Sequence, residues 1–169
     1  MPNKKWIKVL LAIGIIFFLY IEVWGTYVAF RYEPFRKKLG DTVGYNTSSL
    51  KKDGYQYSVF KPHFLSFTGN LHITKLPYAD NGQNDEIPVD IIIWPCGIND
   101  YKVGVGISGP ITYYSEYSSH RVITDMVLDK DMNLLDDTPE KRALYEQNLD
   151  EIETLYHLAY EMWGILELE

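Results

Sequence analysis

The feature that most constrains this chain is a long apolar run near its first residue. Residues 9–21 contain no charged side chain, and the apolar character continues to Phe30 with Glu22 as the one charged residue. As a helix, residues 9–30 would extend about 33 Å, enough to cross a hydrocarbon layer of about 30 Å. We therefore expect residues 1–8 to be a short basic N-terminus and residues 9–30 to be an uncleaved transmembrane anchor that contacts the lipid bilayer.

Two other interpretations of this run stay open. Lysines followed by an apolar stretch are also the layout of a cleaved secretory signal, and an apolar helix can instead lie in a protein core. Cleavage requires small residues at positions −3 and −1, and the best candidate, Val23-Trp24-Gly25, has a bulky residue between them and Glu22 before them. Because the N-terminus is signal-like, we expect it in the cytoplasm, with the following domain extracytoplasmic at the cell membrane.

Glu22 would lie past the midpoint of the anchor, where an ionised acid costs about 2–3 kcal/mol. We interpret it as an acid tolerated near the outer interface, among the aromatic residues Tyr20, Trp24 and Tyr27, which favour that depth. The alternative is a carboxylate that pairs with another helix inside the membrane.

Charge is distributed unevenly along the rest of the chain. Residues 31–124 carry ten Lys or Arg and nine Asp or Glu, whereas residues 125–169 carry three and thirteen. An acidic C-terminal third repels phosphate backbones, and no basic stripe elsewhere offsets it. We therefore expect no nucleic-acid partner.

Sequence motifs for catalysis are weak. The single cysteine, Cys96, leaves no CxxC pair for zinc or redox chemistry, and it lies in the turn signal Trp-Pro-Cys-Gly. The sequence contains no GxSxG, HExxH or P-loop motif. We expect a protein that needs no cofactor and is not an enzyme. The alternative is a small envelope hydrolase that uses Cys96 or a carboxylate pair.

Beyond residue 54 the pattern becomes that of β-strands. Before it, residues 31–54 contain Pro34 and three glycines, which favour an irregular juxtamembrane linker. Short connections between consecutive strands favour an antiparallel meander. The expected strands cover 55–61, 89–95, 101–107, 111–117 and 121–128, with a hairpin over 64–76 that turns at 68–70.

A long amphipathic helix is expected to end the domain, with Thr138 as its N-cap and Pro139 as its first residue. At 100° per residue its apolar side chains fall on one arc, and we predict that Ile152 and Ala159 are buried. The fold class is therefore α+β: residues 55–169 form an antiparallel sheet packed on one face by a C-terminal helix of about 40 Å. The apolar arc comprises Leu144, Leu149, Ile152, Leu155, Tyr156, Ala159, Met162, Trp163 and Leu166.

The opposite arc of this helix forms an acidic ridge of Glu146, Asp150, Glu153, His157 and Glu161. Like charges three or four residues apart on a helix repel each other by a few tenths of a kcal/mol. The ridge is therefore either a solvated face, with Glu153 and His157 exposed, or a docking surface for a basic partner. A weak divalent-cation site is a third interpretation.

A candidate metal site precedes the helix. Asp129, Asp131 and Asn133 occupy positions 1, 3 and 5 of an EF-hand-like loop, and Glu140 occupies position 12. Position 6 is Leu134 where the EF-hand turn requires Gly, and the preceding segment resembles a strand rather than a helix. A calcium-responsive domain is therefore an alternative to a plain turn followed by a capped helix.

The last candidate surface combines Trp94 with Gly104 and Gly106. If the strands over 89–95 and 101–107 pair, Trp94 lies on the face where both glycines present no side chain. Such a flat aromatic surface can stack on a sugar or a peptide, or the ring can simply cover the glycines. The leading interpretation of the whole sequence is a single-pass membrane-anchored binding module whose partner is an envelope protein or a cell-surface glycan.

Overall fold

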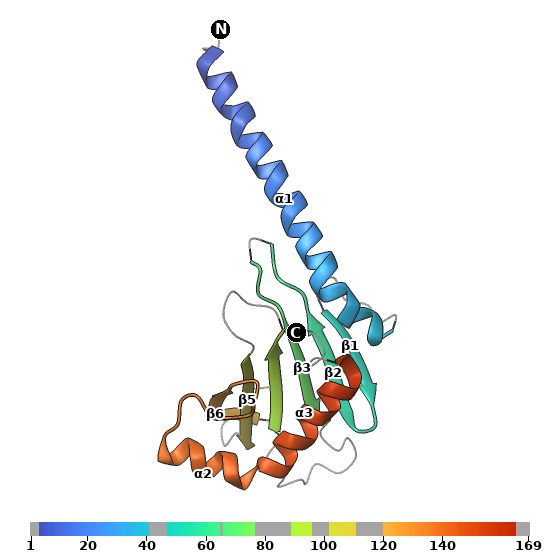
Figure 1. Ribbon diagram of the computed structural model, residues 1–169, viewed down its shortest axis with the longest axis vertical. Coiled ribbons are helices and arrows are strands. Elements are labelled where there is room, and N and C mark those ends of the chain that lie inside the picture. Colours follow the sequence, from blue (N-terminus) through green and yellow to red (C-terminus); the bar gives the residue numbers. More distant parts are fainter. Residues whose placement is uncertain are drawn as a thin grey trace.

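The computed structural model describes residues 4–40, 47–64, 66–76, 89–95, 102–110 and 120–164. The chain begins with helix α1 (Lys4–Lys38), which extends far beyond the rest of the molecule (Figure 1). None of the 18 residues in its most apolar stretch is buried, and Leu10 and Ile16 are more than 60% exposed. The chain therefore has one described helix that is long and apolar enough to cross a membrane.

The C-terminal end of α1 belongs to the folded domain. Tyr32, Phe35 and Leu39 are buried, and the last two lie in the main hydrophobic core. The irregular linker expected over residues 31–54 was therefore wrong in its described parts. The helix continues to Lys38, and residues 47–52 form a strand of the sheet.

The sheet has six described strands in the order of the chain, each antiparallel to its neighbours, which confirms the expected meander. The first arm of the hairpin expected over 64–76 was wrong, because the described residues between 61 and 69 form a loop. The segment 111–117, also expected to be a strand, lies outside the described residues. The strands are β1 (Thr47–Lys52), β2 (Tyr55–Phe60), β3 (Asn70–Lys75), β4 (Val89–Trp94), β5 (Lys102–Pro110) and β6 (His120–Leu128).

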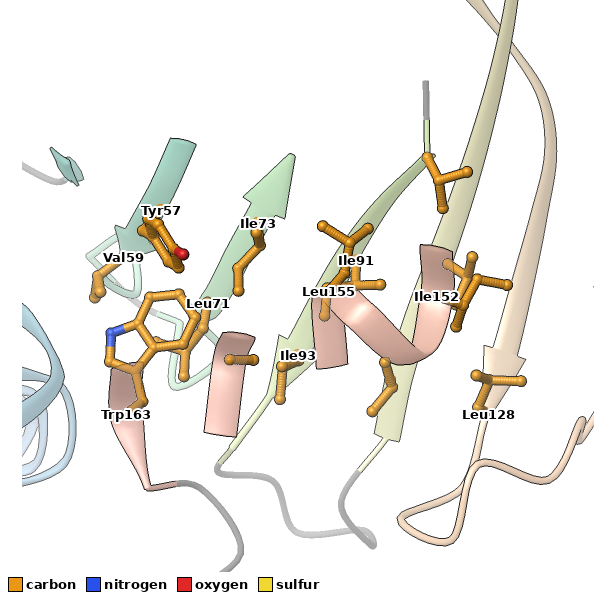
Figure 2. Packing of buried hydrophobic residues seen from close by; sticks show 14 of the residues in the cluster. Tyr57, Val59, Leu71, Ile73, Ile91, Ile93, Leu128, Ile152, Leu155 and Trp163 are labelled. Atoms are coloured by element: carbon orange, nitrogen blue, oxygen red, sulfur yellow. The ribbon is translucent and has the colours of Figure 1, made fainter. Parts of the chain in front are cut away.

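The core lies between one face of this sheet and helix α3 (Leu149–Trp163), as Figure 2 shows. Alternate residues of the strands point toward the helix because side chains along a strand alternate between faces. Trp163 ends the contact at β2, where its ring meets that of Tyr57 edge-on with centroids 6.0 Å apart. The central strand residues of this core are Leu71, Ile73, Ile91, Ile93, Val103, Val105 and Ile107.

The C-terminal helical segment is interrupted at Asn148. Helix α2 (Pro139–Gln147) precedes the break and has no buried residue, although Leu144 and Tyr145 pack half-buried against the core. The fully buried side chains of the C-terminal helical segment all belong to α3. Thr138 caps α2 as expected, since its hydroxyl accepts from the Lys141 N–H at 3.3 Å. The helical phase is confirmed: the predicted apolar residues of α3 are buried or half-buried, and Glu153 and His157 are exposed. Leu166 lies outside the described residues.

Candidate functional site

The sheet has a second face, opposite α3, and we call its part on β3, β4 and β5 the outer face. Its side chains alternate with the core residues of the same strands, and the strand register places them next to one another. The outer face consists of His72, Thr74, Asp90, Ile92, Trp94, Lys102, Gly104 and Gly106.

Trp94 and the two glycines share this face, as the alternation predicted. A Cβ atom added at Gly104 would lie 2.8 Å from Cη2 and 2.9 Å from Cζ3 of the Trp94 ring. The indole therefore lies directly against the backbone of β5, in space that any other residue would fill. The ring is half-buried by this contact, which leaves part of it exposed beside Lys102, its partner across the strands.

Asp90 uses the second glycine in the same way. A Cβ atom at Gly106 would lie 2.2 Å from Asp90 Oδ1, so the carboxylate leans over β5. The other carboxylate oxygen, Oδ2, lies 2.8 Å from His72 Nε2 on β3. Both side chains are about one-quarter exposed, at 22% and 27%. The outer face thus combines an oriented imidazole–carboxylate pair with an indole.

The sequence analysis missed the pair between His72 and Asp90. Alternation within 70–75 and 89–94 puts each residue on a predictable face, but it does not say which residues of two strands lie opposite. Here His72 pairs in register with Ile92, whereas Asp90 pairs with Thr74, two residues further along the strand. A pair of an imidazole and a carboxylate can bind a polar partner through hydrogen bonds. Ser58, in register with His72, is buried and is bonded to Ser49 at 2.9 Å.

The glycines of β5 also match the GxGxxG spacing of a dinucleotide-binding loop, at Gly104, Gly106 and Gly109. That motif works at the turn between a parallel strand and a following helix. Here all three glycines lie within one strand that is antiparallel to both of its neighbours. The match therefore does not indicate nucleotide binding.

The acidic ridge is exposed at each of its five residues, and the break at Asn148 divides it between the two helices. Glu146 belongs to α2, whereas Asp150, Glu153, His157 and Glu161 belong to α3. His157 Nε2 lies 3.2 Å from Glu161 Oε1, with both side chains more than 60% exposed. Exposed ion pairs of this kind contribute little to stability. Binding of a basic partner to the ridge stays a prediction.

The residues of the candidate calcium loop make contacts with their own backbone. The Asp129 carboxylate accepts from the Asp131 N–H at 2.9 Å and from the Asn133 N–H at 2.8 Å. These bonds lower the pKa of Asp129, the contact with Asn133 being the largest cause. Glu140 is the second residue of α2, and the element before Asp129 is strand β6. In the described part of the chain, no cluster of three or more His, Cys, Asp or Glu side chains could hold a metal ion. Calcium binding stays a prediction.

Cys96 lies outside the described residues, so the hydrolase alternative built on it is not tested. No protein family model matches the chain, nor does any curated protein or solved structure.

Proposed function

We propose that this protein is a single-pass membrane-anchored interaction module. Helix α1 holds the chain in a bilayer, and the domain attached to it presents the outer face of the sheet to a partner. The domain lies on the extracytoplasmic side of the cell membrane, in line with the signal-like N-terminus.

The observation that carries the proposal is the apolar half of α1 that the protein itself leaves uncovered. Side chains from Trp6 to Ile16 project from a part of the helix that no other described element covers, including Leu10 and Ile16 at 64% and 68% exposure. Soluble proteins rarely expose a contiguous apolar patch of this extent. A bilayer buries such a surface at no cost to the backbone, because every interior peptide group of a helix is already hydrogen-bonded.

The composition of the outer face supports binding rather than catalysis. The exposed part of the Trp94 ring offers a flat apolar contact, and His72 and Asp90 offer oriented hydrogen-bonding groups beside it. Aromatic residues that are already held in place lose little conformational entropy on binding. The partner classes that fit are an envelope protein or a cell-surface glycan.

Site-specific photo-crosslinking in native membranes tests both parts of the proposal. The full-length chain should stay in the membrane pellet after an alkaline wash. A photoreactive residue in place of Lys102, which is exposed beside Trp94, should then form an adduct. Trp94→Ala should reduce the yield of this crosslinked adduct several-fold. The size of the adduct and its sensitivity to glycosidase show whether the crosslinked partner is a protein or a glycan.

A photoreactive residue at Glu153 is the matched control, because Glu153 is also exposed but lies on α3, on the other side of the sheet. Adducts at Glu153 alone would make the acidic ridge the docking surface. Release of the chain by the alkaline wash would contradict the anchor.

A further inference from the structure

We propose that the loop between β2 and β3 enters the same bilayer that α1 crosses and places the Phe64 side chain inside its hydrocarbon layer. We call the described residues 61–64 and 66–69 the β2–β3 loop. The inference rests on the proposed anchor and extends it, since it gives the domain a second element in contact with lipid.

The loop climbs along α1 toward the N-terminal end of the helix, as Figure 1 shows. Its two ends contact adjacent residues of α1. Lys61 Nζ lies 3.4 Å from Glu33 Oε2, and the Gly69 N–H donates to the Tyr32 hydroxyl at 2.9 Å. Between them, the Ser66 carbonyl accepts from the indole N–H of Trp24 at 2.7 Å. Trp24 precedes Tyr32 by eight helical residues, so the loop rises about 12 Å.

Phe64 reaches still further along the helix. Its ring lies edge-on to those of Trp24, Tyr20 and Phe17, with centroid distances of 5.6, 6.1 and 6.1 Å. Despite these three contacts, Phe64 remains 47% exposed. The loop and α1 thus form one continuous apolar surface that the described protein leaves open.

The position of these contacts along α1 sets the depth of the loop. A hydrocarbon layer of about 30 Å takes about 20 helical residues. Even if the layer begins at Trp6, near the start of α1, it extends as far as Gly25. Phe17 and Tyr20 therefore lie inside the layer, and so does the Phe64 ring that packs against them.

A loop can enter this layer only if its backbone polar groups find partners in the protein. Side chains of α1 supply such partners: besides Trp24, the Tyr27 hydroxyl donates to the Phe67 carbonyl at 3.0 Å. The loop supplies others, because the Ser66 N–H donates to the His63 carbonyl at 2.8 Å. The aromatic residues expected at the membrane interface are thus the residues that hold the loop.

Spin labels on the full-length protein in phosphatidylcholine vesicles test the proposal. In a background with Cys96→Ser, single labels are placed by Phe64→Cys, by Ile16→Cys as the probe in the anchor, and by Lys51→Cys as the probe in water. We expect the label at position 64 to collide more with dissolved oxygen and several-fold less with a water-soluble nickel chelate than the label at position 51. Its values should approach those at position 16.

Phe67→Cys provides a second loop position that does not alter Phe64. Its ring contacts Tyr27 and Tyr20, nearer the domain, so its label should be shallower than that at position 64. A water-like label at 64 beside a lipid-like label at 16 overturns the inference and leaves the anchor intact. A label at 64 shielded from both reagents means a protein contact, and it also overturns the inference. A water-like label at 16 overturns the anchor and the inference together.

Discussion

At the scale of single residues, the outer face contains two side chains of β4 that lie over two glycines of β5. A glycine inside a strand has no side chain to pack against its neighbours, and an aromatic ring that covers the glycine restores part of these contacts. Trp94 does this for Gly104, while Gly106 leaves room for the Asp90 carboxylate that meets His72. The pattern predicts that the glycines position the candidate binding residues.

Gly104→Ala tests this role. The new methyl group would lie 2.8 Å from the Trp94 ring, so the ring must move. We expect the free energy of unfolding, measured by denaturant titration in detergent micelles, to fall by about 1–3 kcal/mol, the usual cost of overpacking.

The matched comparison for this variant is the same substitution in a Trp94→Ala background. With the ring absent, Gly104→Ala should cost clearly less, so that the two changes are not additive. Equal costs in both backgrounds would contradict the interpretation that the glycine makes room for the ring.

The sequence predicts part of this site for a simple reason. Alternation within 89–95 and 101–107 is a local property, and it placed Trp94, Gly104 and Gly106 on one face as observed. The contact between His72 and Asp90 depends on the register between β3 and β4, which residues 76–88 connect. Register is not a local property of either strand, so the pair was not predictable.

At the scale of elements, strand β1 and the break at Asn148 were not predicted, and both have local causes. β1 contains Leu50 as its only large apolar residue, so it lacked the alternation that revealed the other strands. The break at Asn148 does not disturb the apolar periodicity, which continues across it. The Asn148 side chain donates from Nδ2 to the Leu144 carbonyl at 2.8 Å, and such a side-chain bond competes with the backbone hydrogen bonds of the helix.

The edge strand β6 is partly covered by the chain that follows it. The Leu135 N–H donates to the Val127 carbonyl at 2.8 Å, and the Asp136 carboxylate accepts from the Val127 N–H at 3.2 Å. Asp136 also pairs with Lys141 of α2. These contacts occupy backbone groups that an edge strand would otherwise offer to another chain.

Asp136 makes the stability of these contacts with β6 depend on pH. Its hydrogen bond to Lys141, followed by that to the Val127 N–H, lowers the pKa of the carboxyl below its ordinary 3.8. A lowered pKa in the folded state means that the ionised group stabilises the fold above its ordinary pKa, and that this stabilisation is lost as the pH falls through the folded value. Asp136→Asn should therefore lower the melting temperature at pH 7 and have a smaller effect below about pH 4.

The measurement for Asp136→Asn is a set of melting curves from pH 3 to pH 7. Glu153→Gln is the control, because it removes one negative charge from an exposed position on α3 without touching β6. A difference between parent and Asp136→Asn that stays constant over the whole range would contradict the assigned role of the carboxylate.

At the scale of the whole molecule, α1 belongs both to the proposed membrane span and to the domain. The sequence separates these parts, because the apolar run ends before Arg31 and charged residues follow. In the structure the same helix continues to Lys38, and Phe35 and the following Leu39 belong to the core that also contains Trp163. Lys38 Nζ also donates to the Trp163 carbonyl at 3.0 Å, at the end of α3. The proposed membrane span is therefore joined to the domain by one continuous helix rather than by a linker.

Tyr32 is one of the α1 residues that bind the β2–β3 loop, and Tyr32→Phe tests its contribution. The side chain is fully buried, and its hydroxyl accepts from the Gly69 N–H. Removing the hydroxyl leaves a buried donor without this partner, which costs about 1–3 kcal/mol. Gly69 is closely surrounded, since a Cβ there would lie 2.4 Å from the Phe60 carbonyl oxygen.

We expect Tyr32→Phe to speed amide hydrogen exchange at Gly69 and in the neighbouring loop, while exchange in β4 and β5 changes much less. Tyr160→Phe is the matched control, because it removes the same group from an exposed side chain of α3 and should change stability by less than about 0.5 kcal/mol. If both variants leave exchange at Gly69 unchanged, the tyrosine does not couple the two parts. The loop would then keep its place against α1 through its aromatic contacts alone.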